Sequence, residues 1–259
     1  MNDKLPIAET LTLATRTLFA QRNQFLRIGV LATLGFFVIA ILLQSPHVAA
    51  SEPGKEQASR GLYFLAAVLD SLLVSVFSVA WHRLTLLGPQ SLPSGIGMRL
   101  QGRELLYWGR FWLLVLFAIL GIGLMDFIGS LIASAGRLSH TGLGGIVLIG
   151  SALVVPYACA RWSPVFAATS IDQEFSFVKA WRATAGSGMR LLGLYLLAGL
   201  SAFGMLGVFH WIGMALGLAE RAPYAQLFLR DLLDCAILAI WVTTNALVYR
   251  RLSNPGAPS

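Results

Sequence analysis

Six long apolar runs are the feature that most limits how this chain can fold. Each is at least 18 residues long, and they cover residues 25–43, 62–81, 111–132, 143–160, 191–212 and 232–249. A bilayer core about 30 Å thick needs roughly 20 apolar residues of helix per crossing. Bilayer-spanning strands would instead alternate polar and apolar residues. The runs therefore predict an all-α integral membrane bundle of six transmembrane helices.

The composition excludes a soluble globular fold. Apolar residues make up 56% of the 259 positions and charged residues only 12%, whereas soluble proteins carry roughly a quarter of charged residues. So few polar side chains cannot coat the surface of a water-soluble domain.

The basic residues predict the orientation of the spans. With six crossings, 14 of the 19 Lys and Arg residues fall on the side that holds both termini. Basic residues are retained on the cytoplasmic side, so both termini are predicted to be cytoplasmic. The predicted regions are a cytoplasmic segment (1–24), a transmembrane domain (25–249) and a cytoplasmic tail (250–259). We attribute the net charge of +7 to this topology and to contact with anionic phospholipids. No nucleic-acid partner is expected, because no nucleic-acid recognition motif accompanies the basic residues.

Three basic segments are predicted to form amphipathic helices at the membrane interface. The first, residues 1–24, places Ile7, Leu11, Ala14 and Leu18 on one stripe, as an interfacial helix requires. Residues 96–110 repeat this pattern, and residues 172–190 do so less clearly. Ordinary linker helices resting on the surface are the alternative for each. Two prolines, Pro156 and Pro164, predict a kinked or broken helix, after which residues 165–171 are expected to lie partly in the interface.

Polar residues inside the predicted spans form one set of candidate functional residues. The four at similar depth are Asp70, Asp126, His210 and Asp234. Together they would suit a proton relay, a cation site or a polar cavity. Hydrogen bonding between helices is the structural alternative, and a position near the interface is a third. Small residues such as Ser71 and Ser75, one turn apart, are predicted to mark helix contacts.

A second set lies at the predicted cytoplasmic ends of the spans. It comprises His82, Arg83, Arg110, Arg161 and Arg190. Guanidinium groups bind phosphate oxygens in bidentate fashion, so these residues are candidates for a lipid-headgroup pocket. Plain anchoring by positive-inside arginines is the alternative.

No enzyme motif is present in the sequence. The patterns HExxH, GxSxG and GxxxxGK[ST] are all missing. The four histidines lack the spacing of metal ligands, so neither a metal site nor a cofactor is expected. The chain is therefore predicted to be non-enzymatic, with no catalytic residues.

Two stretches carry a family resemblance: SVFSVAWHRLTLLG (75–88) and YACARWSPVFAATSIDQEFSFVKAWRATAGSGMRLLG (157–193). They resemble segments of six-span bacterial inner-membrane proteins related to the membrane domain of glycerophosphodiester phosphodiesterases. The resemblance implies a bacterial inner-membrane location. It implies no activity, because the phosphodiesterase chemistry of those proteins belongs to a separate soluble domain.

The sequence thus favours a non-enzymatic inner-membrane protein whose basic cytoplasmic face contacts anionic lipids or a protein partner, in envelope or lipid homeostasis. The alternative is a small transporter that uses the intramembrane Asp and His residues. A lipid-modifying enzyme ranks third. Substrate, partner and oligomeric state are not encoded in any pattern found here.

Overall fold

The computed structural model describes residues 7–44, 56–92, 98–134, 150 and 153–253, and every regular element within these ranges is helical. Five helices are long and apolar enough to cross a membrane. They are α2 (Arg22–Gln44), α4 (Glu56–Leu87), α5 (Gly102–Ser134), α9 (Gly188–Ala215) and α11 (Pro223–Ser253). The predicted all-α, multi-pass membrane architecture is confirmed to this extent.

The fourth predicted span, residues 143–160, falls largely outside the described residues. Its described part, residues 153–160, is helical, and the helix runs on to Trp162. It passes through Pro156 without interruption and ends at Ser163, directly before Pro164. The predicted break therefore lies at the second proline. A new helix can begin there, because the first residue of a helix does not use its amide hydrogen and proline lacks one.

The short helix that follows this break is α7 (Pro164–Ser170), and all seven of its residues are buried. It contacts α4, α5 and α11. The structure shows that α7 is enclosed by protein, and its position relative to the membrane interface stays a prediction. Its alanines and small hydroxyl residues allow close approach by three helices.

The first helix, α1 (Ile7–Ala20), is amphipathic, as its apolar spacing predicted. Its buried residues are Thr10, Ala14 and Leu18, and they face protein, because α1 packs against α11, α9 and α2. Of the other two predicted interfacial segments, residues 102–110 continue into α5 without a break, since no proline or turn residue separates them from the span. The third, residues 172–190, contains the short helix α8 (Phe177–Ala183) and the first residues of α9.

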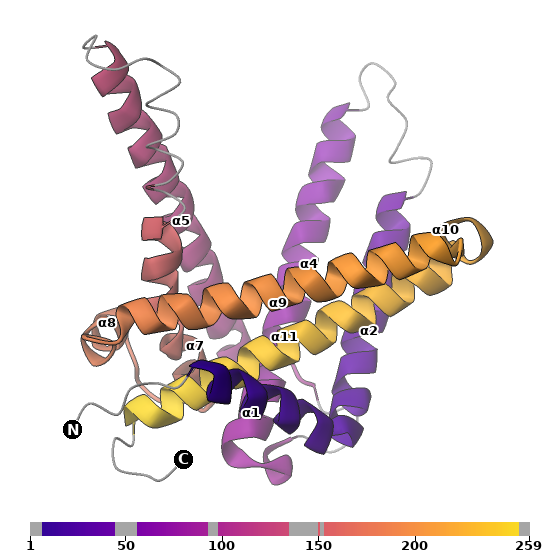
Figure 1. Cartoon of the computed structure of the whole chain (residues 1–259), viewed down its shortest axis with the longest axis horizontal. Coiled ribbons are helices and arrows are strands. Elements are labelled where there is room, and N and C mark those ends of the chain that lie inside the picture. Colours follow the sequence, from indigo (N-terminus) through magenta and orange to yellow (C-terminus); the bar gives the residue numbers. More distant parts are fainter. Residues whose placement is uncertain (1–6, 45–55, 93–97, 135–149, 151–152, 254–259) are drawn as a thin grey trace.

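Two helices form an antiparallel hairpin at the C-terminal end of the chain. In Figure 1, α9 and α11 run side by side across the other long helices. Gly217 makes the turn into α10 (Leu218–Arg221) with φ at 62°, a left-handed conformation that glycine adopts without strain. Half of the most apolar stretch of α11 is buried, whereas none of that of α5 is. Helix α11 is therefore the centre of the packing.

Helices α4 and α5 meet at one end and diverge at the other, while α9 and α11 stay side by side along their length (Figure 1). We call the first the convergent end. The convergent end contains α1 and the segment from α7 to α8. It also contains the last turns of α4 and α11 and the first turns of α2, α5 and α9. Contacts between these helices join the parts of this end. The opposite ends of the long helices form the splayed end. The core lies toward the convergent end, where Phe25 and Phe77 pack on the fully buried Trp81.

Candidate functional site

Basic residues gather at the convergent end. Among the described residues this end holds 13 basic side chains and four acidic ones. The basic residues are Arg16, Arg22, Arg27, Arg83, Arg99, Arg103, Arg110, Arg161, Lys179, Arg182, Arg190, Arg250 and Arg251, and the acidic ones are Glu9, Glu104, Asp172 and Glu174. Four segments far apart in the sequence contribute them. The fold therefore concentrates positive charge on one end of the molecule.

Two of these arginines share a single carboxylate. Nη1 of Arg83, on α4, donates to Oδ2 of Asp172 at 3.2 Å and to the carbonyl oxygen of Ser170 at 3.1 Å. Nη1 of Arg103, on α5, donates to the same Oδ2 at 2.8 Å. Asp172 holds a left-handed φ of 60° just after α7, a conformation that aspartate tolerates better than most residues. One carboxylate thus faces two guanidinium groups, so Arg83, Arg103 and Asp172 together carry a net positive charge.

A third arginine completes this group. A small cavity of about 40 Å³ is lined by Arg83, Arg99 and Arg103, together with Glu104. Glu104 is buried, pairs with Arg103 Nε at 3.2 Å and accepts the Gln101 backbone amide at 2.9 Å. These contacts hold the Glu104 carboxylate at the N-terminus of α5, where the helix dipole favours negative charge. We call Arg83, Arg99 and Arg103 the arginine group; it carries three positive charges against two carboxylates.

The other predicted headgroup residues lie in different surroundings. Arg110 donates through Nη1 to the Thr169 hydroxyl and so ties α5 to α7. Arg190 is half-buried in the first turn of α9. His82 is fully buried, with its ring 6.2 Å from that of Tyr107, and within the described part of the chain neither of its ring nitrogens has a hydrogen-bond partner. The structure therefore brings Arg83 and Arg110 to α7 and places His82 in the interior.

Arg161 holds two parts of the protein together. Its guanidinium donates through Nε to the Thr184 hydroxyl at 3.0 Å and through Nη2 to the Trp181 carbonyl. The guanidinium carbon lies 3.7 Å from the centre of a Trp181 ring, within range of a cation–π interaction. With 8% of its surface exposed, Arg161 serves to fasten α8 to the helix that ends at Trp162.

The structure does not bring all four intramembrane candidates to one place. Asp126 is exposed on α5, a helix that leaves the others toward the splayed end (Figure 1). His210 lines a groove of about 600 Å³ with Arg230 and Gln226, between α9 and α11. Asp234 lies 3.9 Å from Arg230, one turn away on α11. His210 and Asp234 therefore both lie near Arg230, whereas Asp126 lies apart on α5.

Asp70 has a carboxylate neighbour that the sequence reasoning missed. Asp231, on α11, interacts electrostatically with Asp70, on α4, and also with Asp234. Within the described residues, Oδ2 of Asp231 is buried and accepts no hydrogen bond, but no group of three or more His, Cys, Asp and Glu side chains there could hold a metal ion. Sequence reasoning missed Asp231 because it lies one residue before the last predicted span, 232–249.

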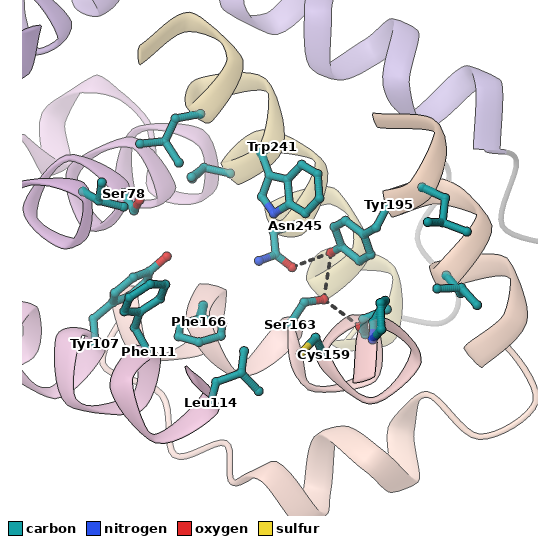
Figure 2. Close-up of a pocket in the computed structure, with 17 residues that line it drawn as sticks. Ser78, Tyr107, Phe111, Leu114, Cys159, Ser163, Phe166, Tyr195, Trp241 and Asn245 are labelled. Carbon is teal, nitrogen blue, oxygen red and sulfur yellow. Dashed lines mark hydrogen bonds between the residues drawn. The ribbon is translucent and has the colours of Figure 1, made fainter. Parts of the chain in front are cut away.

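A cavity of about 340 Å³ lies between α4, α5, α9, α11 and residues 156–166 (Figure 2). We call it the central pocket. Apolar side chains make up most of its wall, and no Asp, Glu, Lys, Arg or His is among the described residues that line it. Its polar groups come from Ser78, Tyr107, Ser163, Tyr195, Trp241 and Asn245.

Hydrogen bonds fix one side of the central pocket. The Tyr195 hydroxyl donates to Oδ1 of Asn245 at 2.7 Å, and the Ser163 hydroxyl lies 2.7 Å from the Tyr195 oxygen. This chain joins α9, α11 and the break before Pro164. Sequence reasoning missed these three residues; the signal was the polar Thr243-Thr244-Asn245 in the last predicted span.

Comparisons with protein-family models, curated proteins and solved structures find no match to this chain. The functional assignment therefore rests on the geometry of its own residues.

Proposed function

We propose that this chain is a non-enzymatic, multi-pass protein of the bacterial inner membrane, with both termini in the cytoplasm, whose convergent end binds anionic phospholipids and acts in envelope or lipid homeostasis. The observation that carries the proposal is the arginine group, in which Arg83 and Arg103 share Asp172 while Arg99 is exposed beside them.

The charge balance favours an anionic headgroup as the ligand. A lipid phosphate can accept hydrogen bonds from two guanidinium groups at once, and Arg83 and Arg103 already converge on one oxygen atom. Each basic residue near an anionic membrane surface contributes about 1 kcal/mol of attraction. Because these arginines lie at helix ends, the headgroup would reach them while its acyl chains remain beside α4 and α5. A protein partner is the competing occupant, and it predicts no lipid selectivity.

Lipid retention tests the proposal. The protein is placed in nanodiscs of phosphatidylcholine and phosphatidylglycerol, and retained lipids are counted by native mass spectrometry. We expect Arg99→Gln to weaken retention of phosphatidylglycerol roughly fivefold, since it removes about 1 kcal/mol without touching the Asp172 contacts. Arg221→Gln, the same charge change at the splayed end, is the matched control and should retain lipid as the wild type does. Equal retention by all three proteins would refute lipid binding by the arginine group.

Orientation is tested separately with cysteine substitutions at Ser51 and Asn254. An impermeant thiol reagent applied to intact cells should label Ser51→Cys and spare Asn254→Cys. Equal labelling would overturn the proposed threading of the chain.

A transporter is the second candidate, favoured by the interaction of Asp70 with Asp231 across α4 and α11. Neither the central pocket nor the His210 groove is lined by Asp70, which ranks this function below lipid binding. If it holds, Asp70→Asn and Asp231→Asn should each abolish pH-dependent cation flux in proteoliposomes, while Asp126→Asn, on the exposed face of α5, should not. Unchanged flux in the first two variants would reject transport through this pair.

A further inference from the structure

The central pocket presents two hydrogen-bond donors from one face of α11. Trp241 and Asn245 are one helical turn apart, so their side chains lie on the same side of the helix, and both point toward the cavity in Figure 2. Because the Tyr195 hydroxyl occupies Oδ1 of Asn245, the amide nitrogen of Asn245 is the group turned to the cavity. Figure 2 draws no hydrogen bond from this nitrogen to another residue of the pocket, and Asn245 is only 5% exposed.

The remaining wall of the pocket excludes charged ligands. No ionisable Asp, Glu, Lys, Arg or His lines the described wall. A buried charge without a partner costs several kcal/mol, so a phosphate or a carboxylate would be held poorly there. An uncharged oxygen that accepts hydrogen bonds would satisfy the free donors at no such cost.

The pocket is also reached from an apolar surface. Leu196, on α9, lines the cavity and is 47% exposed, and Leu197 and Leu200, further along α9, are exposed as well. A volume of about 340 Å³ is near the lower limit of small-molecule sites, about 300 Å³. It accommodates a polar linkage and the start of a chain, while the rest of the chain would lie along α5 and α9.

We propose that the central pocket binds an uncharged acyl ester, such as a monoacylglycerol, whose carbonyl oxygen accepts hydrogen bonds from Nε1 of Trp241 and Nδ2 of Asn245. This site is separate from the arginine group and differs from it in ligand charge. It does not depend on the function proposed above, because none of its lining residues belongs to the basic surface.

The test uses a monoacylglycerol with a photoactivatable acyl chain, added to the purified protein and mapped by mass spectrometry of the labelled peptides. Labelling should fall on peptides of the central pocket and be displaced by unlabelled monoacylglycerol. An alkyl sulfate of the same chain length should displace it at least about tenfold less well, because it carries a permanent charge. Equal displacement by the two compounds would overturn the proposal.

Two substitutions remove the donors one at a time. Trp241→Phe keeps the aromatic ring and loses the indole N–H, and we expect it to weaken binding about three- to fivefold. Asn245→Asp keeps an acceptor for the Tyr195 hydroxyl but replaces the amide donor, and should weaken binding tenfold or more. If both variants bind as the wild type does, these donors do not recognise the ligand. Should Asn245→Asp fail to fold, Trp241→Phe alone decides this point.

A steric pair of variants checks the location. Leu114 lines the pocket and is directed into it in Figure 2, so Leu114→Trp should abolish labelling of the pocket. Leu113 precedes it on α5 and is 53% exposed, so Leu113→Trp is the matched control and should leave labelling unchanged. Labelling that persists in Leu114→Trp would place the ligand elsewhere and refute the proposal.

Discussion

The convergent and splayed ends of this molecule consist of equally apolar helices, yet only one of them is tightly packed. At the convergent end, Trp81, Phe77 and Leu84 are fully buried between helices. At the splayed end, large side chains such as Phe127 and Trp211 are 60% and 67% exposed. Since lipid is as apolar as leucine, hydrophobicity alone does not draw helices together in a membrane. The difference comes from side chains that pack or hydrogen-bond across helices.

Loss of a buried aromatic side chain should have the largest effect on this contrast. Trp81→Ala removes a fully buried indole that contacts Phe25 and Phe77, and we expect it to lower the free energy of unfolding by about 3–5 kcal/mol. Phe127→Ala, at the exposed end of α5, should change it by less than about 0.5 kcal/mol. Unfolding in mixed micelles with increasing denaturing detergent measures both. Equal effects would show that the two ends are held in the same way.

Removal of the Arg161 guanidinium should have the next largest effect. Arg161→Leu loses the bonds to Thr184 and Trp181 and the stacking on the Trp181 ring. Hydrogen bonds from charged groups contribute about 1.5–3 kcal/mol, so we expect destabilisation of about 2–3 kcal/mol, with release of α8 seen as faster hydrogen exchange.

The matched change at the splayed end is Arg230→Leu. The Arg230 side chain is 64% exposed, and its guanidinium lies 3.9 Å from the Asp234 carboxylate. It should cost less than about 0.5 kcal/mol. Because Arg161 is engaged internally, lipid retained per folded molecule should not change in Arg161→Leu. A drop in retained phosphatidylglycerol with normal stability would instead assign Arg161 to headgroup binding.

A single interhelical hydrogen bond should have the smallest effect. Nε1 of Trp81 donates to the Thr243 hydroxyl at 2.8 Å, and Thr243→Val removes this acceptor at nearly constant volume. Hydrogen bonds between membrane helices average about 0.6 kcal/mol and reach about 1.7, so we expect a loss near 1 kcal/mol. Thr244→Val is the control, since Thr244 donates only to the Ile240 carbonyl of its own helix. Its stability should stay within about 0.5 kcal/mol of the wild type.

Helix contacts were predictable where small residues follow a helical period. Ser71 was expected at a helix contact, and it accepts hydrogen bonds from Nε1 of Trp108 at 2.9 Å and of Trp112 at 3.2 Å, which joins α4 to α5. The depth of intramembrane polar residues was a weaker guide. Equal depth predicted that Asp126 and His210 would meet Asp70, but depth says nothing about which faces of two helices are turned toward each other.

The sequence by itself determined that the chain is helical and that several of its helices are long and apolar enough to cross a membrane, because the lengths of its apolar runs match the thickness of a bilayer. It also determined that basic residues collect in alternate connections. The tertiary structure decided which of those residues remain available for a ligand. Arg161 and His82 are enclosed, Arg83 and Arg103 share one aspartate, and Asn245 turns a free amide toward a pocket. These outcomes depend on the rotation of each helix about its axis and on the break before Pro164, which contacts between distant segments set.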